Sequence, residues 1–193
     1  GITISRLCVN AASRGVTAFD HYILGDTMFT NAYIHTMGLW YYKEWHDYYA
    51  GPLKMDKKNF IPYGAHPEYY FYSLFTRLTE TGSYAYRVDT KELSYEEYEE
   101  GADVCVVAFR LPDGSWTYFA VNKGERDRKI AIVNVLDGHP NEMDVYKVTE
   151  DIIPADRKCK PLSASGTLEA KDGVAYLVVP ARGMIAVSDR KVG

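Results

Sequence analysis

Residues 103–122 read DVCVVAFR-LPDG-SWTYFAVN, and this stretch decides the fold of the second half of the chain. Two runs rich in β-branched and aromatic residues flank the tetrapeptide LPDG, residues 111–114. Proline presets φ and glycine accepts a positive φ, so this tetrapeptide is typical of a tight turn. We therefore expect two antiparallel strands, 103–110 and 115–122, joined as a β-hairpin.

Residues 83–193 continue this pattern of short apolar runs separated by turn residues, among them Asp172-Gly173, which favours a hairpin turn. The strands expected from these runs span residues 83–88, 103–110, 115–122, 129–136, 143–149, 166–170, 174–179 and 183–188. The acidic run 90–101 is expected to be a solvated loop or a short helix. Seven or eight short strands with regular turns predict a mainly β fold, an antiparallel β-sandwich over 83–193.

The first 82 residues follow a different pattern. Apolar residues at three- and four-residue spacing predict a helix over 3–14, and a glycine follows to end it. The short apolar run 16–24 predicts a strand buried on both faces, and 26–65 forms a long loop crowded with aromatic residues. A proline in the first turn and an apolar stripe predict a second helix, 67–80. Helix, strand and helix together predict a step of an α/β sheet.

Bulk composition excludes several classes of function. A net charge of −4 gives no basic face, so we expect no nucleic-acid partner. No apolar run approaches the ~20 residues that a membrane span needs. Cys8, Cys105 and Cys159 are too far apart for a metal signature or a disulfide framework, so we expect no metal and no cofactor. Cys105, inside a strand pattern, is expected to be a small core residue.

Aromatic content is the anomaly, with 17 tyrosines and 3 tryptophans. These side chains combine a flat apolar face with a polar edge, as the binding of sugar rings requires. They also fill half-buried strand positions and domain seams, which is the alternative interpretation. No signal peptide is visible, and the chain opens in mid-pattern without an initiator methionine. We therefore expect a fragment or a processed piece, whose compartment the sequence does not specify.

Three motifs, taken with the order of elements, resemble a known family. Residues 66–72, at the start of the helix 67–80, read HPEYYFY. One strand ends in YFAVNK at 118–123, and the closing segment reads VVPARGMIAV at 178–187. These features resemble the C-terminal part of a clan A glycoside hydrolase, in which a (β/α)8 barrel precedes a small β-sandwich. The resemblance implies that 3–14 corresponds to the seventh barrel helix, 16–24 to the eighth strand and 67–80 to the eighth helix.

The same resemblance has a consequence for catalysis. Retaining clan A enzymes use two glutamates, after the fourth and seventh barrel strands, with carboxyls about 5 Å apart. Both positions would precede residue 1, so no catalytic residue is expected in this chain, although Glu44 and Glu68 are carboxylates near aromatic residues. One strand cannot close a barrel, so the remaining strands are expected from another polypeptide or a missing segment.

Active sites of barrels lie at the carboxyl ends of the strands, so residues within or after 16–24 are candidates for contact with sugar. The candidate substrate-binding residues are Asp20, His21, Tyr22, Asp26, Trp40 and Trp45. The resembled families carry an aromatic residue, commonly tryptophan, at the end of the eighth strand, and 16–26 contains no tryptophan, so Trp40 or Trp45 is the expected replacement. The alternatives are loop capping by Asp26, a core role for His21, and packing of the tryptophans at the seam between barrel and sandwich.

Three functions follow from these patterns. The first is the C-terminal part of a glycoside hydrolase acting on β-linked polysaccharide or oligosaccharide, which shapes the cleft and buttresses the barrel. The second is a carbohydrate-binding or structural sandwich without catalysis. Because Trp116 is the single tryptophan of the expected sandwich, the buttress role is favoured over binding. The third, an unrelated adhesion sandwich, is disfavoured by the α/β step before it.

Overall fold

The computed structural model describes residues 1–17, 27–30, 33–35, 39–40, 64–88, 103–133, 142–153 and 160–190. Its elements are α1 (Ile2–Ser13), β1 (Thr27–Thr30), β2 (Tyr33–His35), α3 (Pro67–Leu78), β3 (Tyr84–Arg87), β4 (Val104–Arg110), β5 (Trp116–Asn122), β6 (Arg128–Val133), β7 (Glu142–Val148), the short 3-10 helix η3 (Glu150–Ile152), β8 (Gly166–Glu169), β9 (Val174–Val179) and β10 (Gly183–Ser188). No helix in these ranges is long and apolar enough to cross a membrane.

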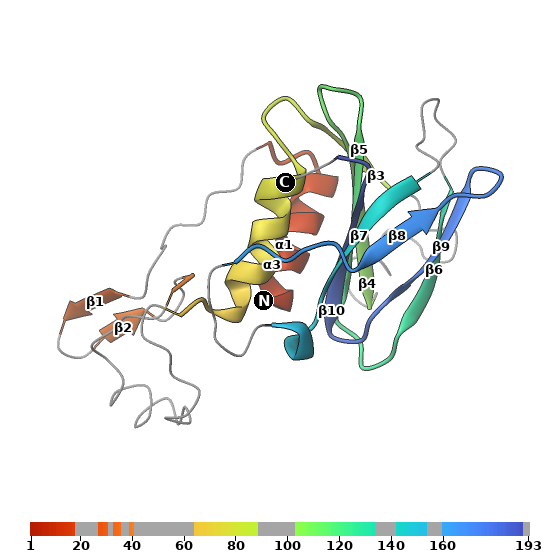
Figure 1. Ribbon diagram of the computed structural model, residues 1–193. Helices are drawn as coiled ribbons and strands as arrows, with labels where there is room; N and C mark the ends of the chain where they lie inside the picture. The colour runs from red at the N-terminus through yellow and green to blue at the C-terminus, as the bar shows by residue number, and fades with distance from the viewer. Residues whose placement is uncertain are drawn as a thin grey trace.

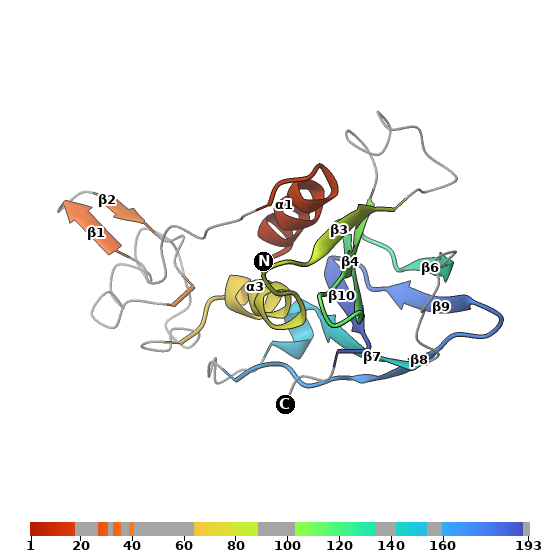
Figure 2. The same ribbon diagram turned by 90° about the horizontal axis from the view of Figure 1, so that it is seen from above.

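The second half of the chain is a β-sandwich, as predicted. Six antiparallel strands form one sheet in the order β3-β4-β5-β10-β7-β8, and β6 and β9 form a second, small sheet. The small sheet lies against one face of the large sheet, and α1 and α3 lie against the other (Figures 1 and 2). All eight strands expected after residue 82 are present, with ends that agree to within one residue wherever the structure describes them.

The large sheet is buried on both faces at its centre, and β10 shows this directly because all six of its residues are buried. Met184 and Ala186 belong to the core shared with the helices. Ile185 and Val187 belong to the core shared with the small sheet. Successive side chains of a strand point to opposite faces. The architecture is therefore three layers, helices, large sheet and small sheet, with β10 in the middle.

The helical layer is held by the apolar stripe that the sequence predicted on α3. The buried side chains of this helix are Tyr70, Phe71, Leu74, Phe75 and Leu78. The ring of Phe75 stacks on that of Phe119 in β5, with centroids 4.2 Å apart. Burial of an apolar side chain of this size contributes roughly 1.5–3 kcal/mol. The helices and the large sheet thus form one continuous core.

The predicted end of the first helix is confirmed in detail. Gly15 has a φ of 83°, its N–H donates to the carbonyl of Ala12, and the N–H of Val16 donates to that of Ala11. This pair of bonds is a Schellman motif, which satisfies carbonyls at a helix C-terminus and favours glycine. The helix expected at 3–14 is therefore α1, and that expected at 67–80 is α3, which ends two residues earlier.

The turn at Asp172-Gly173 is also confirmed, but the strands that flank it pair elsewhere. Asp172 and Gly173 have φ values of 52° and 75°, as a type I′ turn requires. β8 then pairs with β7 in the large sheet, whereas β9 pairs with β6 in the small sheet. This turn therefore carries the chain from one sheet of the sandwich to the other.

The expectations for the N-terminal part are tested only where the structure describes it. Val16 and Thr17 are not in a strand, and 18–24 lie outside the described residues. Within the expected loop 26–65, β1 and β2 form a short antiparallel pair. The acidic run 90–101 and the end of the strand expected at 129–136 lie outside the described residues.

Candidate functional site

Trp40 is the one candidate substrate-binding residue that falls within the described part of the chain. The other predicted site residues, together with Glu44, lie outside it; they are Asp20, His21, Tyr22, Asp26 and Trp45. Their contact with sugar stays a prediction. The geometry of the predicted site is accordingly built from Trp40 and the residues that contact it.

Trp40 is positioned by backbone pairing with the segment before α3. The N–H of His66 donates to the carbonyl of Leu39 at 2.8 Å, and Trp40 forms an isolated antiparallel bridge with Ala65. Leu39, Ala65 and His66 are buried, whereas Trp40 is half-buried. This pairing holds residues 39–40 of the aromatic loop against the segment that precedes α3. It also fixes the direction in which the indole of Trp40 leaves the backbone.

Aromatic contacts connect Trp40 to the sandwich. The indole lies 5.6 Å from the ring of Tyr69 at 49°, and Tyr69 meets Tyr70 edge to face at 5.2 Å. Tyr70 is fully buried in the core between the helices and the large sheet. Trp40 and Tyr69 pack against that core and keep part of their surface accessible. The arrangement fits packing at a seam, and a half-buried ring held rigidly is also what stacking on a sugar needs.

No family model and no curated protein matches the sequence. Among solved structures, the catalytic domain of GH30 xylanase C from Talaromyces cellulolyticus superposes with a TM-score of 0.63 at 16% identity, over 99% of this chain and 35% of that chain. The GH30 subfamily 8 xylanase from Clostridium acetobutylicum gives a TM-score of 0.57 at 11% identity, over 98% of this chain and 38% of that chain.

This chain has the fold of part of a GH30 xylanase. GH30 xylanases are clan A glycoside hydrolases, so the resemblance inferred from the motifs is confirmed at the level of fold. The assignment of 3–14, 16–24 and 67–80 to the last helix, strand and helix of a barrel stays a prediction. The chain spans little more than a third of the length of these two GH30 structures. At such low identity the likeness establishes the fold, and an activity is a separate question.

Glu68 lies beside Tyr69 in the first turn of α3. A carboxylate in the first turn interacts favourably with the positive end of the helix dipole. This placement gives the acidic side chain a structural role at the start of the helix.

No group of three or more histidine, cysteine, aspartate or glutamate side chains could hold a metal ion among the described residues. The described thiols lie inside the helix-facing core, where burial raises the pKa of Cys8 to about 12 and that of Cys105 to about 11. Neither thiol is poised as a nucleophile, because the reactive species is the thiolate.

Proposed function

We propose that this chain is the C-terminal portion of a glycoside hydrolase that acts on a β-linked polysaccharide or oligosaccharide. In this proposal the catalytic glutamates lie outside the chain. The main support for the proposal is the superposition of 98–99% of the chain on two structures that are both described as GH30 xylanases. The motifs at 66–72, 118–123 and 178–187 support the same proposal independently of the structure.

The described residues support a buttressing role for the sandwich. α1 and α3 pack on the large sheet through one shared core that contains Val9, Phe71 and Leu74 from the helices and Phe119 from the sheet. Helices anchored in this way fix the two ends of the segment that joins them. We propose that this segment, with Asp20, His21, Tyr22, Asp26 and Trp45, lines the substrate cleft together with Trp40.

The catalytic part of the proposal is tested by assaying the chain alone and extended by the sequence that precedes it. The chain alone is expected to release neither aryl alcohol from aryl β-xylosides nor reducing sugar from β-1,4-xylan, whereas the extended protein hydrolyses xylan. Turnover by the chain alone that is lost in Glu44→Gln would overturn the proposal. An extended protein that binds xylan without hydrolysing it would support the alternative of a carbohydrate-binding or structural module.

The role of Trp40 is tested in the same extended protein by separating binding from stability. If its indole stacks on sugar, Trp40→Ala raises KM about tenfold, and Trp40→Phe restores much of the binding because an aromatic face remains. If Trp40 only packs against Tyr69 and the core, Trp40→Ala lowers Tm and leaves KM unchanged. Tyr72→Ala is the matched control, because Tyr72 of α3 is a half-buried ring that packs against the same core as Trp40.

A further inference from the structure

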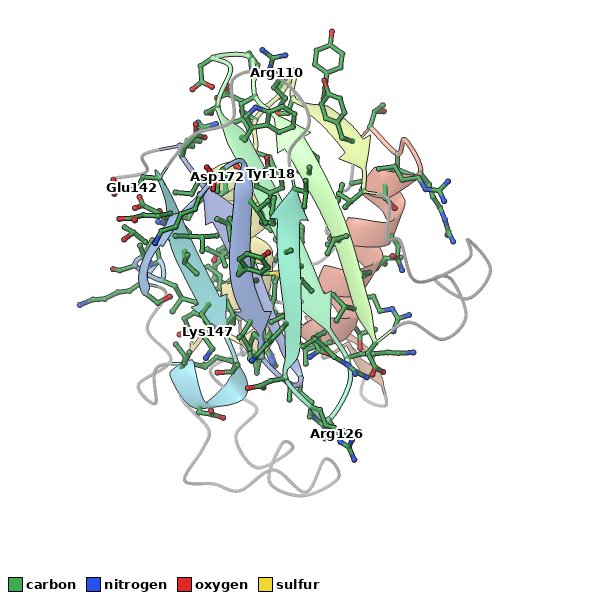
Figure 3. All side chains as sticks on the ribbon, turned by 90° about the vertical axis from the view of Figure 1, so that its right-hand side faces the viewer. Arg110, Tyr118, Arg126, Glu142, Lys147 and Asp172 are labelled. Atoms are coloured by element: carbon green, nitrogen blue, oxygen red, sulfur yellow. The ribbon has the colours of Figure 1, made fainter. Side chains whose placement is uncertain are left out.

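One corner of the large sheet carries a cluster of aromatic residues that the proposed function does not use. The small sheet packs against β5, β8 and β10 through β9, and against Val104 and Val106 of β4, whereas β3 is an edge strand of the large sheet. The cluster consists of Tyr84 and Tyr86 from β3, Arg110 from β4, and Trp116 and Tyr118 from β5, and is called the aromatic corner below. Arg110 and Tyr118 lie at one end of the sheet, on the face turned away from the helices (Figure 3).

Strand register places the side chains of the aromatic corner on one face. Tyr84 is opposite Arg110, which is opposite Trp116, so these residues form one row across three strands. Tyr86 and Tyr118 flank Ala108 in the next row. Residues directly opposite each other in an antiparallel sheet have Cβ atoms about 5 Å apart, so each row is a continuous surface.

Trp116 is the rigid floor of the aromatic corner. It is only 2% exposed, and its ring lies 5.3 Å from Tyr86 and stacks on Tyr118 at 5.9 Å. The guanidinium of Arg110 lies over the indole, 5.9 Å from its centroid. Tyr84, by contrast, is 73% exposed. The buried indole thus supports Tyr86, Tyr118 and Arg110, and the accessible ring of Tyr84 lies one strand beyond Arg110 in the same row.

Arg110 supplies an accessible donor in the aromatic corner. Its guanidinium contacts the indole ring and, among the described residues, forms no ion pair with a carboxylate. The indole Nε1 of Trp116 also has no hydrogen-bond partner there, but it is buried and out of reach of a ligand. An accessible cationic donor opposite the exposed ring of Tyr84 matches a ligand that has both C–H faces and hydroxyl oxygens.

The remaining exposed apolar surface of the sandwich differs in kind. On the outer face of the small sheet, Tyr176 stands beside the aliphatic Val178 and opposite Ala131. The aromatic corner exposes no aliphatic side chain, and each of its accessible groups has a hydrogen-bonding atom. This composition favours a sugar over an apolar protein surface, because a sugar pairs ring stacking with polar contacts.

We propose that the aromatic corner binds a β-linked glycan chain, with Tyr84 and Tyr86 stacking on the sugar rings and Arg110 donating to hydroxyl oxygens. The surface is formed by β3, β4 and β5 and contains neither Trp40 nor the other candidate residues of the cleft. It goes beyond the proposed function, because it needs no catalytic group and would hold substrate at a second position on the protein. The sequence disfavoured binding because Trp116 is the single tryptophan of the expected sandwich, but the structure buries Trp116 and exposes Tyr84 instead.

Affinity electrophoresis in gels that contain soluble β-1,4-xylan tests this inference on the chain as given. We expect the chain to be retarded, and Tyr84→Ala and Arg110→Gln each to weaken binding about tenfold, which corresponds to about 1.4 kcal/mol. Tyr176→Ala is the matched control, because it removes an equally exposed tyrosine from the outer face of the small sheet. Tm measurements on all variants show that the fold is retained.

Three outcomes would overturn the inference. The first is a chain that is not retarded by xylan or by β-1,4-glucan, and the second is an equal loss of binding in Tyr176→Ala and Tyr84→Ala. The third is self-association, measured by sedimentation, that Tyr84→Ala abolishes, because the aromatic corner would then be an interface between copies. The gel measures binding without turnover, so a chain that is not retarded leaves the hydrolase proposal intact. Conversely, absence of hydrolysis by the extended protein leaves the proposed glycan site intact.

Discussion

Thr117 lies where β5, β10 and the end of α3 meet in the interior. Its Oγ1 donates to the carbonyl of Leu78 at 2.8 Å and lies 2.7 Å from Oγ of Ser188, and both residues 117 and 188 are fully buried. The carbonyl of Leu78 is one of the last four of its helix, which have no partner within the helix. A single buried hydroxyl thus joins the helical layer to the sheet.

Thr117→Val should lower the free energy of unfolding by roughly 1–3 kcal/mol, because it keeps the shape but leaves the Leu78 carbonyl unsatisfied. Chemical denaturation of the wild-type and variant chains measures the difference. Thr167→Val, at an exposed position of β8, is the control and should change stability by less than about 0.5 kcal/mol. An equal effect of the two substitutions would contradict the assigned role of Thr117.

The buried thiols give a second prediction at this scale. Because burial raises the pKa of Cys8 to about 12 and that of Cys105 to about 11, almost no thiolate is present at pH 8. Alkylation of these two cysteines should therefore be slow in the native chain and fast in denaturant, as followed by mass spectrometry of peptides. Rapid native labelling of Cys105 would show that β4 is not covered by α1.

Among the elements, the β4–β5 hairpin shows how a turn is fixed locally. Both the N–H and the hydroxyl of Ser115 donate to Oδ1 of Asp113, at 2.9 and 2.6 Å. These hydrogen bonds lower the pKa of Asp113 below its ordinary value of 3.8. The carboxylate form stabilises the folded state at neutral pH, and this contribution is lost as pH falls through the lowered pKa.

Asp113→Ala should reduce stability at pH 7 by roughly 0.5–1 kcal/mol, a small value because the site is exposed. The difference between the two chains should shrink as the pH is lowered below 3.8. Thermal unfolding measured from pH 7 down to pH 2.5 gives both quantities. Asp113→Asn keeps a side-chain oxygen that can accept from Ser115, so it should retain part of the stability at pH 7, and residue 113 should then add no pH dependence. A loss of stability in Asp113→Ala that is the same at every pH would contradict the role assigned to the carboxylate.

At the scale of the whole molecule, the helices and the sandwich share one core. Phe119, Val121 and Met184 of the large sheet are buried against α1 and α3 and belong to the same cluster as Val9 and Leu74. The predicted domains 1–82 and 83–193 are therefore joined by apolar packing across the predicted boundary. A sheet without its helices would present this apolar face to water.

A chain limited to residues 83–193 should consequently be aggregated or unfolded, whereas the 193-residue chain is expected to melt in one transition. Circular dichroism melts and light scattering of both proteins check this. Replacing Phe119 and Val121 by threonine in the short chain should reduce its aggregation by making the exposed face more polar. A short chain that is monomeric and melts as steeply as the whole would show that the sandwich is independent of the helices.

The sequence by itself determined most of the described elements of this protein, but not β1, β2 or η3. Hydrophobic periodicity marked α1, α3 and the eight strands of the sandwich, and Gly15, Gly114 and the Asp172-Gly173 pair marked where elements end. These features follow from local backbone preferences, which act between near neighbours in the chain. Trp40, the one predicted site residue within the described part, was proposed as a ring in an aromatic run that could replace the missing tryptophan of the resembled family, and its contact with sugar stays a prediction.

Only the tertiary structure decided which elements meet. β8 and β9 flank a tight turn yet join different sheets, because their pairing partners are distant in the chain. Trp116 lies beneath Arg110 for the same reason. The row from Tyr84 through Arg110 to Trp116 depends on the register of three strands, and a shift by one residue would turn each side chain to the opposite face. Pairing and register are set by the total apolar burial of both sheet faces, a sum over the whole molecule that no local pattern contains.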